Sequence, residues 1–168
     1  MRAPHHPEHR VPIRLGLESP DQSDVLRLID ELDAYQRPLY PPESHHGIDL
    51  EALLAPAVDF AVARDEAGAA LGCGAVVLTS DYAELKRMYV VPAARGRGVG
   101  QQLLALLEAT AIARGARRFA LETGYLQHAA LALYARCGYT RCGPFGPYVE
   151  DPNSVFMTKP VVAGEVVG

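Results

Sequence analysis

The chain has 168 residues, of which 49% are hydrophobic and 21% are charged, and its formal net charge is −4. This composition is typical of a globular protein; it excludes collagen-like, coiled-coil and disordered chains and gives no reason to expect a nucleic-acid or membrane partner. With only three cysteines and no apolar run of transmembrane length, we expect a cytoplasmic protein with reduced thiols and no metal.

The chain length suits one domain with a sizeable core. Residues 1–10 are rich in proline and histidine and lack the apolar stretch of a signal peptide, so we expect a flexible tail there. A single domain is expected over residues 11–160, and a short C-terminal tail over residues 161–168.

Hydrophobic periodicity predicts the elements of the N-terminal half. Alternating apolar residues predict strands, and apolar residues at helical spacing predict helices. Ser19 precedes Pro20, so we expect Ser19 to cap the first helix and Pro20 to lie in its first turn. The expected elements are a strand over 11–17, a helix from Ser19 to about Gln36, a short helix over 50–54, a hairpin of strands 58–64 and 70–78, and a strand over 82–91.

The strongest helical pattern covers residues 98–114, and Gly115 is placed to end that helix. The remaining elements are a strand over 118–122, a helix over 127–136, and strands over 139–142 and 154–159. The predicted order is therefore βααβββαβαββ. This is an α/β (α+β) class, with a mostly antiparallel sheet and one parallel crossover between Val91 and Phe119.

The most informative segment is Arg95-Gly96-Arg97-Gly98-Val99-Gly100, which joins a strand to the strongest helix. Three alternate glycines allow a ligand to approach the backbone amides closely. The helix that follows directs its unpaired N–H groups and its positive dipole end into the loop. The two arginines add positive charge and forked donors. Together these features indicate a site for a phosphate or pyrophosphate.

Other interpretations of this loop fit less well. A P-loop ends in Gly-Lys-Ser/Thr, which is absent here. The dinucleotide motif G-x-G-x-x-G matches at Gly96 and Gly98 but has Gln101 in the third place, although Glu122 follows at the spacing of a ribose-binding acid. A glycine turn that binds nothing is the remaining alternative.

Arg95, Gly98 and Gly100 form an R-x-x-G-x-G motif that resembles the acetyl-CoA loop of the GNAT acetyltransferase family. Other segments resemble the same family in the same order, and two of them resemble small stand-alone bacterial members. The similarity covers roughly residues 11–160. The matching segments are 83–90 with Pro92, 121–124, 127–139 and 145–148.

The resemblance implies a twisted mixed sheet flanked by helices and an N-acetyltransferase that transfers acetyl from acetyl-CoA to a primary amine in a ternary complex. Pantetheine would bind between two parallel strands that splay apart beyond a bulge, and the pyrophosphate would bind the loop amides. The implied cofactor-binding residues are Met88, Tyr89, Val90, Arg95, Gly96, Arg97, Gly98, Val99, Gly100, Gln101 and Gln127. No metal is implied.

At pH 7 only about one alkyl amine in a thousand is unprotonated, and only the unprotonated amine can attack, so the reaction benefits from a base. Glu84 is the first candidate base and Tyr134 the candidate proton donor to the leaving thiolate. Each has a structural alternative: Glu84 could form a surface ion pair with Lys86, which shares its strand face, and Tyr134 could pack in the core. Cys137 and Cys142 allow a ping-pong route through a thiol, although core filling suits them better.

The acceptor would bind between the first two helices and the later loops. The candidate residues are Tyr40, Glu43, His46 and Tyr148, and Glu43 could attract a cationic amine. Arg87 could bind an acceptor carboxylate or serve as a structural ion-pair partner. A small amine or amino-acid-like metabolite is the first acceptor class and a protein amine the second. A catalytically silent acyl-CoA-binding module is the alternative function, and a homodimer is possible.

Overall fold

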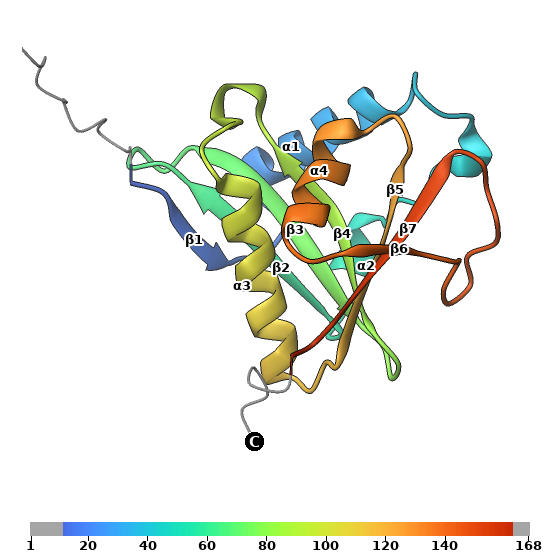
Figure 1. The fold of residues 1–168 in the computed structure, drawn as a ribbon. Helices are drawn as coiled ribbons and strands as arrows, with labels where there is room; N and C mark the ends of the chain where they lie inside the picture. The colour runs from blue at the N-terminus through green and yellow to red at the C-terminus, as the bar shows by residue number, and fades with distance from the viewer. Residues whose placement is uncertain (1–11, 163–168) are drawn as a thin grey trace, which may run out of the picture.

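The computed structural model describes residues 12–162 (Figure 1). Seven strands form one sheet in the order β1-β2-β3-β4-β5-β7-β6. The strands are β1 (Arg14–Leu17), β2 (Val58–Arg64), β3 (Ala70–Leu78), β4 (Ala83–Val90), β5 (Arg118–Gly124), β6 (Thr140–Cys142) and β7 (Ser154–Pro160). The helices are α1 (Ser23–Gln36), α2 (Leu50–Leu53), α3 (Val99–Ala113) and α4 (His128–Arg136), with short 3-10 turns at Pro42–Ser44 and Pro92–Ala94. The predicted order of strands and helices is confirmed, as is the hairpin of β2 and β3.

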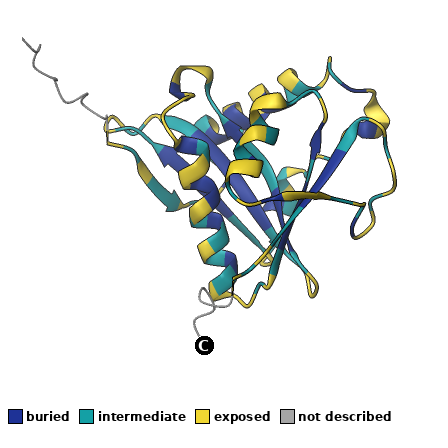
Figure 2. Cartoon of the chain, viewed as in Figure 1, coloured by how far each residue is buried: buried dark blue, intermediate teal, exposed yellow. Residues whose placement is uncertain are grey.

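Helices cover both faces of the sheet, with α3 and α4 in front of it and α1 behind it in Figure 1. Side chains alternate along each strand, so neighbouring residues of β2 belong to different cores. Ala61 and Ala63 pack against α3, whereas Phe60 and Val62 pack against α1 and α2. The central strands are consequently the most deeply buried part of the sheet (Figure 2).

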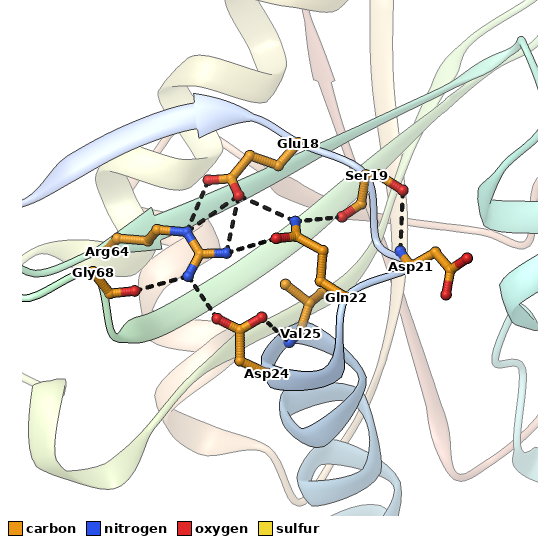
Figure 3. Close-up of polar contacts among 8 residues, drawn as sticks. All are labelled: Glu18, Ser19, Asp21, Gln22, Asp24, Val25, Arg64 and Gly68. Carbon is orange, nitrogen blue, oxygen red and sulfur yellow. Dashed lines mark hydrogen bonds and ion pairs between the residues drawn. The ribbon is translucent and has the colours of Figure 1, made fainter.

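The first helix begins later than predicted. Its N-cap is Gln22, and the Ser19 hydroxyl instead accepts a hydrogen bond from the Asp21 amide at 3.1 Å. The Gln22 side chain donates to the Ser19 carbonyl and accepts from Arg64, which fixes this turn ahead of the helix (Figure 3). Ser19 therefore stabilises a turn and not the helix. The first strand begins at Arg14; Val11 and the two predicted tails beyond 12–162 lie outside the described residues.

Strand β4 contains the bulge that the resemblance implies. Lys86 pairs with Ala75 and Tyr89 with Cys73, so β4 has one residue more than β3 between these pairs. Arg87 lies in this bulge with a φ of 56°, which is unusual for a residue other than glycine. The bulge changes the direction of the strand next to its parallel neighbour.

The two parallel strands separate after the bulge begins. β4 and β5 pair only from Ala83↔Phe119 to Leu85↔Leu121. Both strands continue, to Val90 and to Gly124, without further pairing to each other. This separation leaves the inner edges of β4 and β5 available where the cavities described below meet.

Candidate active site

A groove of about 450 Å³ runs from β4 across the glycine loop to α4. All of the predicted cofactor-binding residues except Arg97 line it, including Gln127 at the start of α4. Arg97 is exposed at the tip of the loop and lies outside the groove lining. The structure thus brings together one set of residues that the sequence analysis drew from three separate segments.

The glycine loop presents open backbone amides at the N-terminus of α3. Gly98 is the N-cap residue and adopts a left-handed conformation with φ 78°. The N–H groups of residues 99–101 make no hydrogen bond within residues 12–162, because intrahelical bonding begins with Gln102 N to Gly98 O. A Cβ atom on Gly100 would lie 3.0 Å from Leu133 Cδ2, so this position is tight. Such a cradle of free N–H groups at a helix N-terminus fits an anionic phosphate.

The inner edge of β4 carries backbone groups that do not pair with β3. Val91 N donates to Leu71 O, and alternation along the strand then turns the polar groups of Met88 and Val90 toward the gap beside β5. Arg95 Nε donates to Val90 O at 3.2 Å. Arg95 therefore helps to order the loop, and among the described residues the backbone of Met88 pairs with no residue of β5.

A second, smaller cavity of about 110 Å³ adjoins the groove. The two spaces share the side chains of Leu32, Met88, Gln127, Ala130 and Tyr134. Of the predicted acceptor residues, Tyr40, His46 and Tyr148 line this cavity. Glu43 does not: it is exposed on the 3-10 turn that follows Pro41, and its buried neighbour Ser44 faces the cavity in its place.

Glu84 belongs to a buried polar cluster in this cavity. Tyr148 donates to Glu84 Oε2 at 2.5 Å, and Lys86 Nζ lies 3.3 Å from the same oxygen. Lys86 also donates to the Tyr148 hydroxyl at 2.9 Å and to the His46 carbonyl at 3.0 Å. The ion pair considered as the alternative role of Glu84 is present, but it is buried, since only 9% of the Glu84 side chain is exposed. Burial, followed by the bond to Glu84, raises the pKa of Tyr148.

Tyr134 lies where the groove and the smaller cavity meet. It is 6% exposed, and its ring packs edge-on against Tyr139 at 5.8 Å. Its hydroxyl makes no hydrogen bond to any residue in the described part of the chain, so it is free to bond a ligand. Burial raises the pKa of Tyr134, which keeps the hydroxyl protonated at neutral pH. Tyr134 is therefore part of the core and also part of the cavity wall.

Glu122 was assigned no catalytic role from the sequence, yet it lines the smaller cavity beside Thr123 and Gly124. Burial raises its pKa to about 7, against the opposing effect of Lys86. The sequence pattern that could have identified Glu122 is the alternation of side chains along β5. This alternation places Glu122 and Ala120 on one face and Phe119 and Leu121 on the other. Glu122 lines the cavity and not the groove at the glycine loop, so the geometry gives no support to a ribose-binding role.

Two other polar residues near the cavity have structural partners. Gln127 Oε1 accepts from the Thr123 hydroxyl at 2.5 Å and from Gly124 N at 3.1 Å, which fixes the turn between β5 and α4. Arg87 pairs with Asp33 at 2.5 Å and donates to the Ile48 carbonyl. The structural role considered for Arg87 is thus the one observed.

The cysteines do not support a ping-pong route. Cys137 and Cys142 are free thiols outside both cavity linings, and Cys73 is buried in the core between β3 and α1. Burial raises the pKa of each thiol, which disfavours the nucleophilic thiolate. Within residues 12–162, no cluster of three metal-binding side chains is found, and no helix has the length and apolarity needed to span a bilayer.

Comparison with known proteins finds relatives that match most of this chain. Residues 25–139 match the acetyltransferase (GNAT) family. The chain is 46% identical over 151 residues to an IAA acetyltransferase of Azospirillum brasilense, covering 89% of this chain and 98% of the relative.

Solved structures agree with this match. A protein of Klebsiella pneumoniae subsp. pneumoniae MGH 78578, to which acyl-CoA N-acyltransferase activity is ascribed, superposes with a TM-score of 0.76 at 39% identity, covering 89% of this chain and 98% of the other. The PaiA N-acetyltransferase of Thermoplasma acidophilum, solved with coenzyme A, gives a TM-score of 0.68 at 15% identity over 89% and 99% of the two chains, a similarity of fold alone.

Proposed function

The chain belongs to the GNAT family of acetyltransferases, and we propose that it transfers acetyl from acetyl-CoA directly to the primary amine of a small metabolite. The observation that carries this proposal is the junction of the groove with the smaller cavity at Tyr134. An elongated groove at a helix N-terminus suits coenzyme A, and a polar cavity at its end suits an amine. Both reactants can then be held together at one place, which supplies much of the rate acceleration.

The fit of acetyl-CoA rests on the backbone of the loop and of β4. The open N–H groups of residues 99–101 would hold the pyrophosphate, and the free polar groups of Met88 would bond pantetheine. Arg95 would keep the loop in place through Val90 O. Bound acetyl-CoA would supply an activated acetyl thioester at the junction. Tyr134 would donate a proton to the departing sulfur, because its hydroxyl is protonated and unpartnered among the described residues.

The smaller cavity favours a small acceptor. At about 110 Å³ it takes a small molecule or the end of a side chain. Two carboxyl groups, Glu84 and Glu122, line it and favour a cationic amine, and either could take a proton from it. Tyr40, His46 and Tyr148 would shape the acceptor site. The predicted homodimer and cytoplasmic location stay predictions.

The test is a calorimetric titration of the purified protein with acetyl-CoA, followed by an amine panel in which CoA release is measured with a thiol reagent. IAA is tested separately from the amines, because a relative at 46% identity is named for it. Micromolar binding with release that depends on one small amine is the expected result. Binding without release from any small amine or peptide amine would favour a silent acyl-CoA-binding module. Absence of binding would contradict the proposal.

A further inference from the structure

Two carboxyl groups face the cavity in which the amine would react, but their surroundings differ. Glu84 has its Oε2 held by the Tyr148 hydroxyl and next to Lys86 Nζ. If that oxygen took a proton, it would lose both donors. Glu122 accepts no hydrogen bond of standard geometry from the residues that the structure describes. Its carboxylate is therefore the one that remains free to bond an incoming ammonium group.

The position of Glu122 also suits proton transfer. It follows the last pair of β4 with β5, so it lies where these strands separate and where both cavities approach Tyr134. Ser154 of β7 pairs with Gly124, two pairs further along than Glu122 and on the same sheet face, and its buried hydroxyl has no hydrogen-bond partner within the described chain. This hydroxyl lies near enough to Glu122 to lower its pKa without a hydrogen bond of standard geometry, and it is available to a molecule bound beside it.

We propose that Glu122, and not Glu84, takes the proton from the acceptor ammonium group, and that Glu84 is a positioning residue that holds Tyr148 and Lys86. This inference rests on the proposed acetyltransferase function. It gives the two carboxyl groups different tasks: one touches the reacting nitrogen, and the other fixes the wall of the acceptor cavity. The sequence-based choice of Glu84 as base is replaced by a residue of the neighbouring strand.

The proton balance of the proposed step is complete. The Glu122 carboxylate accepts one proton from the ammonium group and later releases it to solvent. The free amine forms the C–N bond as the C–S bond breaks, and the Tyr134 hydroxyl gives its proton to sulfur. The second proton lost from nitrogen returns to the Tyr134 oxygen. One amine cation and one thioester thus yield one amide, one thiol and one proton.

The electrostatics of the cavity match this task. A base works best when its pKa lies near the working pH, and burial brings the pKa of Glu122 to about 7. Its carboxylate must be ionised to act, so kcat/KM should rise with pH through this value. The charged and titratable groups around Glu122 come from β4, α4, the α1–α2 connection and the β6–β7 connection. Lys86 and Glu84 lie on β4, and Tyr134 lies on α4. Tyr40 lies in the α1–α2 connection, and Tyr148 and Asp151 lie in the β6–β7 connection.

The decisive experiment measures kcat/KM against pH for the wild type, Glu122→Gln and Glu84→Gln, with CoA release as the readout. For an alkyl amine we expect Glu122→Gln to lower kcat/KM by about 100-fold or more and to remove the inflection near pH 7. For a weakly basic amine that is already unprotonated at pH 7, the loss should shrink to a few fold. Glu84→Gln should keep the inflection and raise the acceptor KM. Glu66→Gln, an exposed hairpin-turn variant, is the matched control.

A second measurement follows the carboxyl carbons of 13C-labelled glutamate by NMR. One signal should titrate near pH 7 in the wild type and be lost in Glu122→Gln. If the wild type turns over and Glu122→Gln retains its rate or its inflection, or if no such signal exists, the assignment of Glu122 is overturned while the acetyltransferase stands. If the wild type binds no acetyl-CoA and releases no CoA with any amine, the proposed function itself fails. Calorimetry with acetyl-CoA shows whether each variant is folded.

Discussion

The hydroxyl of Tyr148 donates a 2.5 Å hydrogen bond to Glu84 and accepts one of 2.9 Å from Lys86. This pair joins the β6–β7 connection to β4 across the wall of the smaller cavity. Without it, a buried carboxylate would keep only its ionic partner, and the connection would lose its polar anchor at this point. The bond therefore links the stability of the fold to the shape of the proposed acceptor site.

Tyr148→Phe tests this link. A hydrogen bond to a charged group contributes about 1.5–3 kcal/mol, so we expect the free energy of unfolding to fall by about 2 kcal/mol. The acceptor KM should rise while the affinity for acetyl-CoA stays unchanged. Urea denaturation and calorimetry measure both effects. Tyr125→Phe is the control, because Tyr125 is 46% exposed and lies outside both cavities; equal destabilisation by the two variants would contradict the role of the bond.

Tyr134→Phe tests the proposed proton donor. The substitution keeps the buried ring and removes only the hydroxyl, so we expect stability and acetyl-CoA affinity to change little. The kcat for CoA release should fall by about 100-fold, the lower part of the range for general acid–base catalysis. Tyr82→Phe, a change at a half-buried residue outside both cavities, should keep the wild-type rate. A fall in kcat of less than about threefold in Tyr134→Phe would mean that another group or water protonates sulfur.

Gly98→Ala tests the cradle at the start of α3. Gly98 has a φ of 78°, and a residue with a Cβ pays roughly 1–2 kcal/mol in this conformation. We expect the loop to shift its amides and acetyl-CoA to bind about tenfold more weakly by calorimetry. Gly16→Ala should leave binding unchanged, since a Cβ there meets nothing within 4 Å. Unaltered binding by Gly98→Ala would argue against a role of these amides.

Local patterns in the sequence predicted most of the fold. Hydrophobic periodicity located every strand and helix, and the helix over 98–114 and its Gly115 end agree closely with α3. The start of α1 was wrong because Ser19 binds the Asp21 amide, a competing local bond that a capping pattern does not reveal. The left-handed conformation of Arg87 was also unpredictable, since it depends on the register between β3 and β4.

The candidate site, like the fold, was predicted only in part from the sequence. The groove residues come from contiguous motifs, so sequence located them together. The acceptor cavity depends on which loops fold over the sheet, and this is why Glu43 was expected in it and is exposed outside it. Glu122 was missed as a catalytic candidate because its distinguishing property is burial beside the gap between strands, which only the assembled sheet creates.

Arg64→Met tests the polar cluster that fixes the start of α1 (Figure 3). Arg64 bonds Glu18, Asp24 and the Gly68 carbonyl, and its bonds lower the pKa of both carboxyl groups. Because both are partly exposed, we expect a loss of about 1–2 kcal/mol in the free energy of unfolding at pH 7. A carboxyl group whose pKa is lower in the folded state stabilises the fold at pH values above its unfolded-state pKa. This stabilisation is lost as the pH falls through the folded-state pKa. The difference between wild type and variant should therefore shrink below pH 4 or so in urea denaturation series, whereas Arg141→Met, an exposed change on β6, should match the wild type throughout.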